Sequence, residues 1–423
     1  MVDSALTECL TELFLLKSPN QIKNLPFESI PGKEAIPFRF AIHLENGEEK
    51  KVFVKRVNRE GQDPLLKGTG SSVDALKWEA NFYQNFLPEI RRFLETHEGM
   101  TADIIDSCFV EYYGYKENED ESFLVLQDLS EKQCQAPTNM LRLRGTEFEE
   151  ALPILQKRAE LSGIFYAWRE DKIRSGADGH QFESFLNVSE TDKGLATANM
   201  NNILQNVCSS SVTVKMLKML QNNTAKEHAQ LKERCNLNTL DKLIRWQMDD
   251  NRKPVLLTTD NNLWGPVLGD FQPLNIAISD KIDQVVFFDF THFMLSSVML
   301  EFQRYMGLCT NLDPNREQLL EVYIDSFIES ISRFKLDVSR KQLMAEFNLT
   351  KFYYIQWRFF IYSFFPMQNA ELYNAVSDAD ISTEEGEATV LKMLEKYPEN
   401  WKCIIGLVDL VNKIDKDPLQ YLT

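Results

Sequence analysis

The chain reads Val267-Leu-Gly-Asp-Phe-Gln-Pro-Leu-Asn-Ile-Ala-Ile278, and soon after Gln284-Val-Val-Phe-Phe-Asp-Phe290, where an otherwise helical half changes to a β-pattern. The apolar residues of both pieces predict a buried hairpin of two short strands. Asp270 lies in the loop before the hairpin, Asn275 at the start of its first strand and Asp289 at the end of its second. The hairpin is therefore expected to hold three polar side chains at its rim.

This set of polar side chains suits phosphoryl transfer. A carboxylate such as Asp270 orients an attacking hydroxyl and accepts its proton, while an amide oxygen and a second carboxylate hold Mg²⁺ on the phosphates. Asp and Asn are also common in loops, because they cap and turn the backbone. The spacing alone therefore leaves both interpretations open.

The first 130 residues carry strand patterns, and the rest of the chain is mainly helical. The turn Asn46-Gly47 joins two β-rich runs, which is a strong hairpin signal. The elements expected before residue 130 are strands at 38–44, 51–57, 108–115 and 123–129 and helices at 3–17 and 74–96. The later helices are expected at 146–169, 213–250, 317–334, 341–365 and 389–413, with a polar loop at 171–210. The change near residue 130 predicts a domain boundary there.

Lys55 ends a strand that is otherwise apolar, and Glu79 follows about one turn into the next helix. A lysine on such a strand is costly unless it has a partner. A strand lysine and a helix glutamate, followed far downstream by Asp270-x4-Asn275 and then by Asp289-Phe, have the chain order of a protein-kinase-like phosphotransferase. The presence of Lys55 and Glu79 in the same chain favours the catalytic interpretation of the loop.

Five stretches carry a family resemblance: VFVKRV (52–57), KWEANFYQNFLPEI (77–90), FLVLQDLS (123–130), VLGDFQPLNIAI (267–278) and VVFFDF (285–290). In them the chain resembles the CHK-kinase-like (ecdysteroid kinase-like) family, relatives of choline kinases and aminoglycoside phosphotransferases. The resemblance implies an α+β, two-lobed protein-kinase-like fold. A small β-rich N-lobe over 1–130 would bind the nucleotide. A large helical C-lobe over 131–423 would carry the catalytic loop (267–290) and the acceptor-binding helices.

The resemblance also implies roles in an ATP-dependent kinase that phosphorylates a hydroxyl group of a small molecule. Lys55 would contact the α- and β-phosphates of ATP with Glu79 orienting it, and the hinge backbone from Gln127 to Leu129 would meet adenine. The remaining roles fall on Asp270 as the catalytic base and on Asn275 and Asp289 as ligands of Mg²⁺.

The chain departs from the family's usual pattern at four places. After the metal aspartate the family tends to have an acidic residue followed by Leu, and the nearest match here is Glu301-Phe302, with Arg304 beyond. Leu268 stands where the family usually has a histidine that braces the catalytic loop, and Gln127 stands where it has a glutamate. The segment from Gly32 to Phe38 has one glycine where a glycine-containing loop would cover the nucleotide, and Pro37 has no amide N–H to donate. These departures keep a second hypothesis open, a pseudokinase that binds or scaffolds without turnover.

Two further features have a structural and a functional interpretation. The aromatic helix at 352–365 either fills the core of the helical lobe, which we favour, or lines a pocket for an apolar or cationic acceptor. His292 is expected to be a packed loop residue, because it stands alone near the hairpin.

Composition narrows the class of protein. The 423 residues include 46 Lys+Arg and 63 Asp+Glu, a net charge of −17, which disfavours nucleic acid as a partner. Seven cysteines without a CxxC pair, and an N-terminus without the charge pattern of a signal peptide, indicate a cytoplasmic protein. The most apolar stretch is too short to span a membrane. Neither the acceptor nor the oligomeric state can be predicted from these features.

Overall fold

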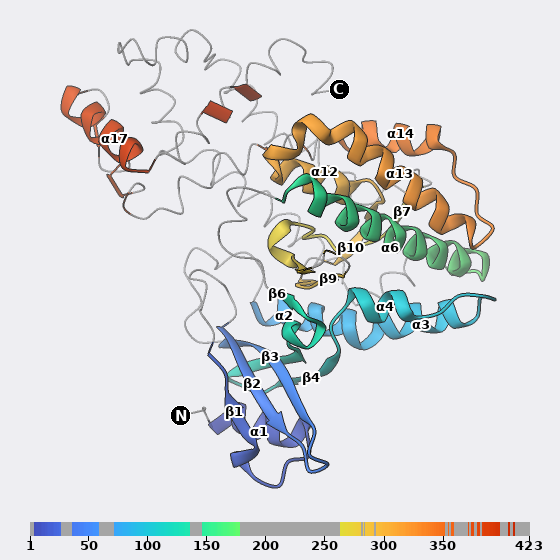
Figure 1. Ribbon diagram of the computed structural model, residues 1–423, viewed down its shortest axis with the longest axis vertical. Helices are drawn as coiled ribbons and strands as arrows, with labels where there is room; N and C mark the ends of the chain where they lie inside the picture. Colours follow the sequence, from blue (N-terminus) through green and yellow to red (C-terminus); the bar gives the residue numbers. More distant parts are fainter. Residues whose placement is uncertain are drawn as a thin grey trace.

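The computed structural model describes residues 4–26, 36–58, 72–135, 146–177, 263–280, 284–291 and 293–351, together with Ile282, the segment 383–397 and scattered positions between 354 and 410. A β-sheet with flanking helices forms the first part of the chain, and the second part is mainly helical (Figure 1). The predicted α+β architecture, with a β-rich and a helical part, is confirmed. The position of the boundary near residue 130 stays a prediction.

Five strands form one antiparallel sheet in the order β1-β2-β3-β5-β4. They are β1 (Ile22–Asn24), β2 (Ile36–His43), β3 (Glu49–Asn58), β4 (Tyr112–Glu117) and β5 (Glu121–Gln127). The turn between β2 and β3 contains Gly47 at a φ of +84°, a conformation that favours glycine. The hairpin predicted around Asn46-Gly47 is therefore confirmed, whereas β1 was not predicted.

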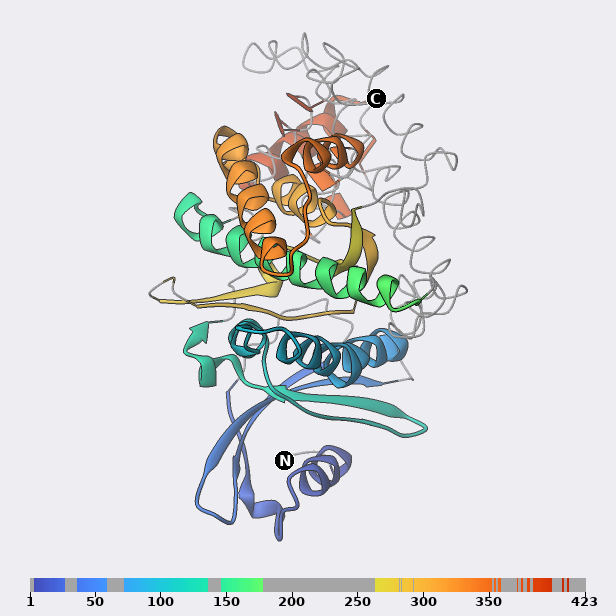
Figure 2. The ribbon, with the colours of Figure 1, turned by 90° about the vertical axis from the view of Figure 1, so that its right-hand side faces the viewer.

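Helices cover both faces of this sheet (Figure 2). One face packs on α1 (Ser4–Leu13), and the other faces α2 (Ser72–Asn81), a π-helical turn (Phe82–Phe86), α3 (Leu87–Glu95) and α4 (Asp103–Cys108). Side chains alternate along β3, so Val52 and Val54 join the small core under α1, while Val57 joins the large core that includes α2 and α3. The same alternation turns Lys55 toward α2.

Two expected elements of the first part are interrupted or begin later than expected. The helix expected at 74–96 is interrupted by the π-helical turn, which carries the buried Phe82, Tyr83 and Phe86. The strand expected from Cys108 begins only at Tyr112, because Cys108 ends α4, where Ile105 and Cys108 face the core at helical spacing.

The second part contains two small sheets and a set of long helices. The strands β6 (Cys134–Gln135), β8 (Ile276–Ser279) and β9 (Val285–Phe287) form one sheet, and β7 (Trp264–Val267) pairs with β10 (Met294–Ser297). The helices are α6 (Phe148–Arg174), α12 (Leu300–Leu308), α13 (Arg316–Ser332), α14 (Arg340–Leu349) and α17 (Glu384–Lys396). The predicted hairpin is confirmed as β8 and β9, whereas β7 and β10 were not predicted.

Close helix packing holds this part together. A Cβ on Gly163 of α6 would lie 2.6 Å from Ser330 Cβ on α13, so the two helices can approach only because the residue is glycine. The helix expected at 341–365 is not continuous. Its first part, α14, ends at Leu349, and the described positions Tyr354, Trp357 and Arg358 are again helical. Among the helices of the described residues, none combines the length and apolar character needed to cross a bilayer.

Several expectations lie outside the described residues. They concern the glycine-containing loop up to position 35, the region from 178 through 250, His292, and most of the stretches 352–365 and 398–413. The described part of the aromatic stretch agrees with the core interpretation, since Tyr354 and Trp357 are buried.

Candidate active site

Lys55 lies between two carboxylates that come from distant parts of the chain. Its Nζ is 2.6 Å from Oε2 of Glu79 on α2 and 3.3 Å from Oδ1 of Asp289, just after β9. The Glu79 side chain is fully buried, whereas 26% of the Asp289 side chain is exposed. One cation therefore joins the sheet, the helix above it and the loop after the hairpin.

Burial and charge act in opposite directions on this group. Burial alone would lower the pKa of Lys55, but Asp289 and Glu79 outweigh it and raise that pKa, so the ammonium stays charged. Burial raises the pKa of Glu79 against the attraction of Lys55, and Asp289 adds to the rise. With all three charged, the cluster has one negative charge in excess, an environment that favours a cation beside Asp289.

The position of Asp289 depends on its backbone and on the next residue. Its φ of +68° lies in the left-handed region, which Asp tolerates better than most residues. Phe290 is fully buried, and its ring centroid is 4.0 Å from that of Phe82 in the π-helical turn. This packing fixes the end of the hairpin under α2, and Thr291 donates its hydroxyl to Asp289 Oδ1 at 3.2 Å.

Asp270 and Asn275 form a second pair next to the first. The Asn275 amide nitrogen donates to Asp270 Oδ2 at 2.8 Å, and Gln272 Nε2 donates to the same oxygen at 2.7 Å. The backbone N–H of Phe288 donates to Asn275 O at 3.1 Å, which places Asp289 one residue away from this pair. The loop residues and the lysine cluster therefore belong to one connected site.

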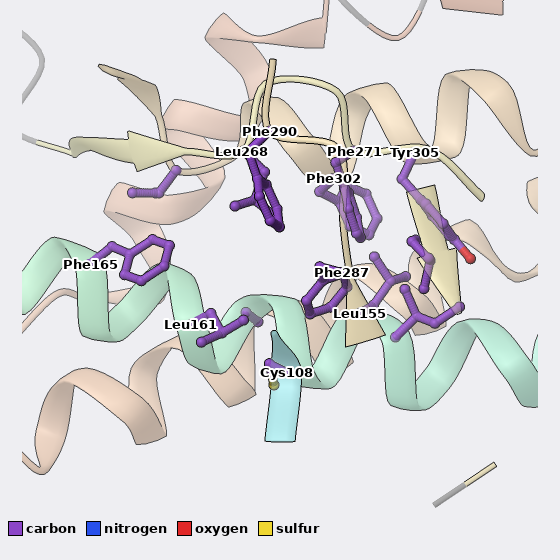
Figure 3. Close-up of a cluster of buried hydrophobic side chains, with 14 of the residues drawn as sticks. Cys108, Leu155, Leu161, Phe165, Leu268, Phe271, Phe287, Phe290, Phe302 and Tyr305 are labelled. Carbon is purple, nitrogen blue, oxygen red and sulfur yellow. The ribbon is translucent and has the colours of Figure 1, made fainter. Parts of the chain in front are cut away.

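The residue at the expected histidine position has a different role. Leu268 is 3% exposed and lies in the buried hydrophobic cluster that includes Phe271, Phe290 and Phe302 (Figure 3). Its backbone N–H donates to Glu301 Oε1 at 2.7 Å. The loop is thus held by a backbone contact to α12, and the missing histidine does not leave it unsupported.

Four charged residues near the site had no role assigned from the sequence, although Glu301 and Arg304 stood at the nearest match to a family element. Glu301 pairs with Arg158 of α6, and the side chains of both are completely buried. Arg304 donates to Gly269 O and pairs with Asp270. Arg39 of β2 pairs with Asp128 at 2.6 Å. One of these was detectable as a charge on an apolar face, because Arg158 follows Leu155 at helical spacing.

The two predicted hinge residues lie at the end of β5. Gln127 pairs with Val52 of β3, three residues from Lys55, and its side chain accepts the backbone N–H of Glu111 at 3.2 Å. Leu129 begins a 3₁₀ turn that Asp128 caps. The described contacts tie Gln127 to Glu111 and Val52 rather than to the charged cluster, so its role toward adenine stays a prediction. Pro37 lies in β2 opposite Lys55 rather than in a turn.

Asn275 and Asp289 have the chemistry of magnesium ligands. Mg²⁺ prefers oxygen donors and is commonly held by one or two protein groups together with substrate phosphates. Asn275 uses its amide nitrogen on Asp270, so its amide oxygen is the donor left for a metal. The described residues contain no group of three or more His, Cys, Asp or Glu side chains suited to a metal, so a closed all-protein site is absent from this part of the chain.

If the site binds ATP, as the resemblance implies, we expect Glu79→Gln to raise the KM for ATP up to about tenfold, because the amide keeps an oxygen for Lys55 but loses the charge, and a hydrogen bond between two charged groups is worth about 1 kcal/mol more than one with a neutral partner. The pH dependence of stability should change as well. A raised folded-state pKa means that wild-type stability falls as pH increases from the usual value of a glutamate. The variant should therefore lose less unfolding free energy between pH 4 and 8, measured by urea titration. A wild-type KM, together with an unchanged pH dependence of the unfolding free energy, would contradict the role of Glu79 in orienting Lys55.

The chain matches one protein family and is similar to several solved structures. A family model described as the ecdysteroid kinase-like family matches residues 36–336. No curated protein matches the sequence. Among solved structures, an amicoumacin kinase in complex with AMP-PNP and Ca²⁺ is 9% identical with a TM-score of 0.42, covering 95% of this chain and 95% of that one.

Two further solved structures are similar at the same level. An ethanolamine kinase of Plasmodium vivax is 10% identical with a TM-score of 0.43, covering 92% of this chain and 86% of that one. A type I macrolide 2′-phosphotransferase is 11% identical with a TM-score of 0.39, covering 93% and 98%. At this level of similarity neither a substrate nor a mechanism follows from them.

Proposed function

Because the chain belongs to the ecdysteroid kinase-like family, we propose that it is an ATP- and Mg²⁺-dependent kinase that phosphorylates a hydroxyl group of a small molecule. The observation that carries this proposal is the contact of Lys55 with both Glu79 and Asp289. Charged side chains from a strand, a helix and a distant loop converge there, beside a loop that holds Asp270 and Asn275.

Each residue has a task in the proposed reaction. Lys55, oriented by Glu79, moves from Asp289 to the phosphates of ATP. Asp270 orients the acceptor hydroxyl and takes its proton while the hydroxyl oxygen bonds to the γ-phosphorus and the bond to ADP breaks. Asn275 and Asp289 would hold Mg²⁺, which would supply positive charge to the transferred group. The backbone near Gln127 and Leu129 faces adenine.

The acceptor is a small molecule with a hydroxyl group. The acceptor pocket is expected in the helical lobe, including residues 171–260 and the C-terminal tail, and most of 171–260 lies outside the described residues. The acidic chain favours neither nucleic acid nor another polyanion as partner. We place the protein in the cytoplasm on its cysteine pattern, as a proposal.

A pseudokinase is the second candidate. Two observations favour it: Leu268 replaces the histidine of the family, and the carboxylate of Asp270 already accepts bonds from Gln272, Asn275 and Arg304. Such a protein would keep the fold and lack turnover. Nucleotide binding and turnover therefore have to be measured separately.

We expect ATP with Mg²⁺ to raise the melting temperature by about 2 °C or more at tenfold the dissociation constant, because a ligand that binds only the folded state stabilises it. ATP with EDTA should give a smaller shift, since Asn275 and Asp289 need the metal to engage the phosphates. No shift at millimolar ATP would contradict the proposed kinase.

Turnover is tested by measuring ATP consumption with sterols, amino alcohols and aminoglycosides as acceptors. Asp270→Asn serves as the control, because it keeps the shape of the side chain and loses the base. Acceptor-dependent ADP release by the wild type alone supports the kinase. A metal-dependent thermal shift without ADP release from any acceptor or from water supports the pseudokinase.

A further inference from the structure

Arg304 reaches the catalytic loop from α12, one turn after Glu301. It is 6% exposed, and its two terminal nitrogens donate to Gly269 O and to Asp270 Oδ1. Burial lowers the pKa of Arg304, while Asp270 and Glu301 act against that change. One planar guanidinium therefore binds two consecutive loop residues. Its flat shape fixes the direction of its hydrogen bonds better than the ammonium group of a lysine would.

The contact with Arg304 uses one of the acceptor positions of the Asp270 carboxylate. A carboxylate has about four lone-pair positions. Gln272 and Asn275 occupy the two on Oδ2, and Arg304 occupies one on Oδ1. One position on Oδ1 is left by these contacts, so an acceptor hydroxyl can approach the carboxylate from one direction.

Arg304 is in turn held by the C-terminal part of the chain. Its guanidinium carbon lies 3.8 Å from the ring centroid of Trp357. Gly307, three residues further along α12, allows this contact, because a Cβ there would lie 2.8 Å from Trp357 Cβ and 2.9 Å from Tyr354 O. The aromatic segment thus sets the plane of the guanidinium as well as filling the core.

We propose that Arg304, clamped by Trp357, is the positioning residue that orients the carboxylate of Asp270. This inference rests on the proposed kinase function. It also explains why the loop tolerates Leu268 in place of the family's histidine. A side chain from α12 holds the loop, so a brace from within the loop is not needed. Because the acceptor is unidentified, acceptor-independent hydrolysis of ATP by water is the probe, with Asp270 as base in both reactions.

We expect Arg304→Met to lower kcat for ATP hydrolysis about 100-fold with the KM for ATP within about twofold, because a small misplacement of a catalytic group has an effect of that size. Arg304→Lys should fall between, since it keeps the charge and loses the fork. Trp357→Leu, which keeps Arg304, should lower kcat less than Arg304→Met does.

The matched control is Arg316→Met. Arg316 also lies over an aromatic ring, 3.9 Å from the centroid of Tyr354, but it donates to Gln303 rather than to Asp270. Its kcat should stay within about threefold of the wild type. An equal loss in both arginine variants would overturn the proposal, as would a wild-type or higher kcat in Arg304→Met; a higher value would show that Arg304 restrains Asp270 from reacting.

A second measurement separates this inference from the kinase proposal. If the wild type releases no ADP with water or with any acceptor tested, the proposed function fails, and a double-mutant cycle of Arg304→Met with Asp270→Ala still tests the contact. Urea unfolding of the four proteins should give effects that differ from additivity by about tenfold in the unfolding equilibrium constant. Additive effects would overturn the contact itself.

Discussion

Asp270→Asn is expected to lower kcat by about 10²- to 10⁴-fold, the range found when a positioned general base is lost. The amide keeps an oxygen that can face Arg304, and it keeps the volume of the side chain. The KM for ATP should change little, because the contacts proposed for the nucleotide come from Lys55, Glu79 and the end of β5. Steady-state kinetics with the acceptor found by screening, or with water, measure both constants.

Asparagine is a better replacement than alanine at this position. Asp270→Ala would remove the charge and every acceptor atom opposite Arg304, whereas Asp270→Asn removes the charge and keeps one acceptor oxygen; a buried charge without any partner destabilises a fold. Loss of activity in the alanine variant would therefore mix catalysis with folding. The thermal transition of Asp270→Asn should fall less than that of Asp270→Ala, and a folded Asn variant with wild-type kcat would exclude Asp270 as the base.

Glu301→Ala is expected to decrease the free energy of unfolding by about 3–5 kcal/mol, a large share of the about 5–15 kcal/mol that stabilises a typical protein. Two groups lose their partner at once. Arg158 is left as a completely buried charge, and the N–H of Leu268 is left without an acceptor. Urea unfolding followed by circular dichroism measures the change.

A paired variant identifies the cause of that loss. Arg158→Met combined with Glu301→Gln removes both charges and keeps an oxygen for the Leu268 N–H. It should be more stable than Glu301→Ala, because replacing a buried ion pair by uncharged groups is often close to neutral. If Glu301→Ala lost less than about 1 kcal/mol, the buried pair would not be an anchor of the loop.

Local patterns predicted the elements that carry the site. The apolar runs around Asn275 and Asp289 predicted a hairpin, and β8 and β9 are that hairpin. The turn Asn46-Gly47 predicted the pairing of β2 with β3, which sets the face on which Lys55 lies. These signals depend on neighbouring residues only, so they can be interpreted without a tertiary structure.

Element boundaries were less predictable where tertiary packing competes with the local pattern. The strand expected from Cys108 is helical at its start, since Ile105 and Cys108 pack into the core. The short strands β7 and β10 were missed, because four-residue segments are stabilised by their pairing with each other rather than by a pattern of their own.

Local sequence patterns identify the polar side chains of the site, their order along the chain, and the strands, helices and loops on which they lie. Long-range packing brings Lys55 to Asp289 and places Arg304 and Glu301 against the loop at Leu268 and Asp270. The physical reason is that these contacts join residues far apart along the chain. The packing of α6 and α12 determines which residues meet, and a local sequence pattern does not contain this information.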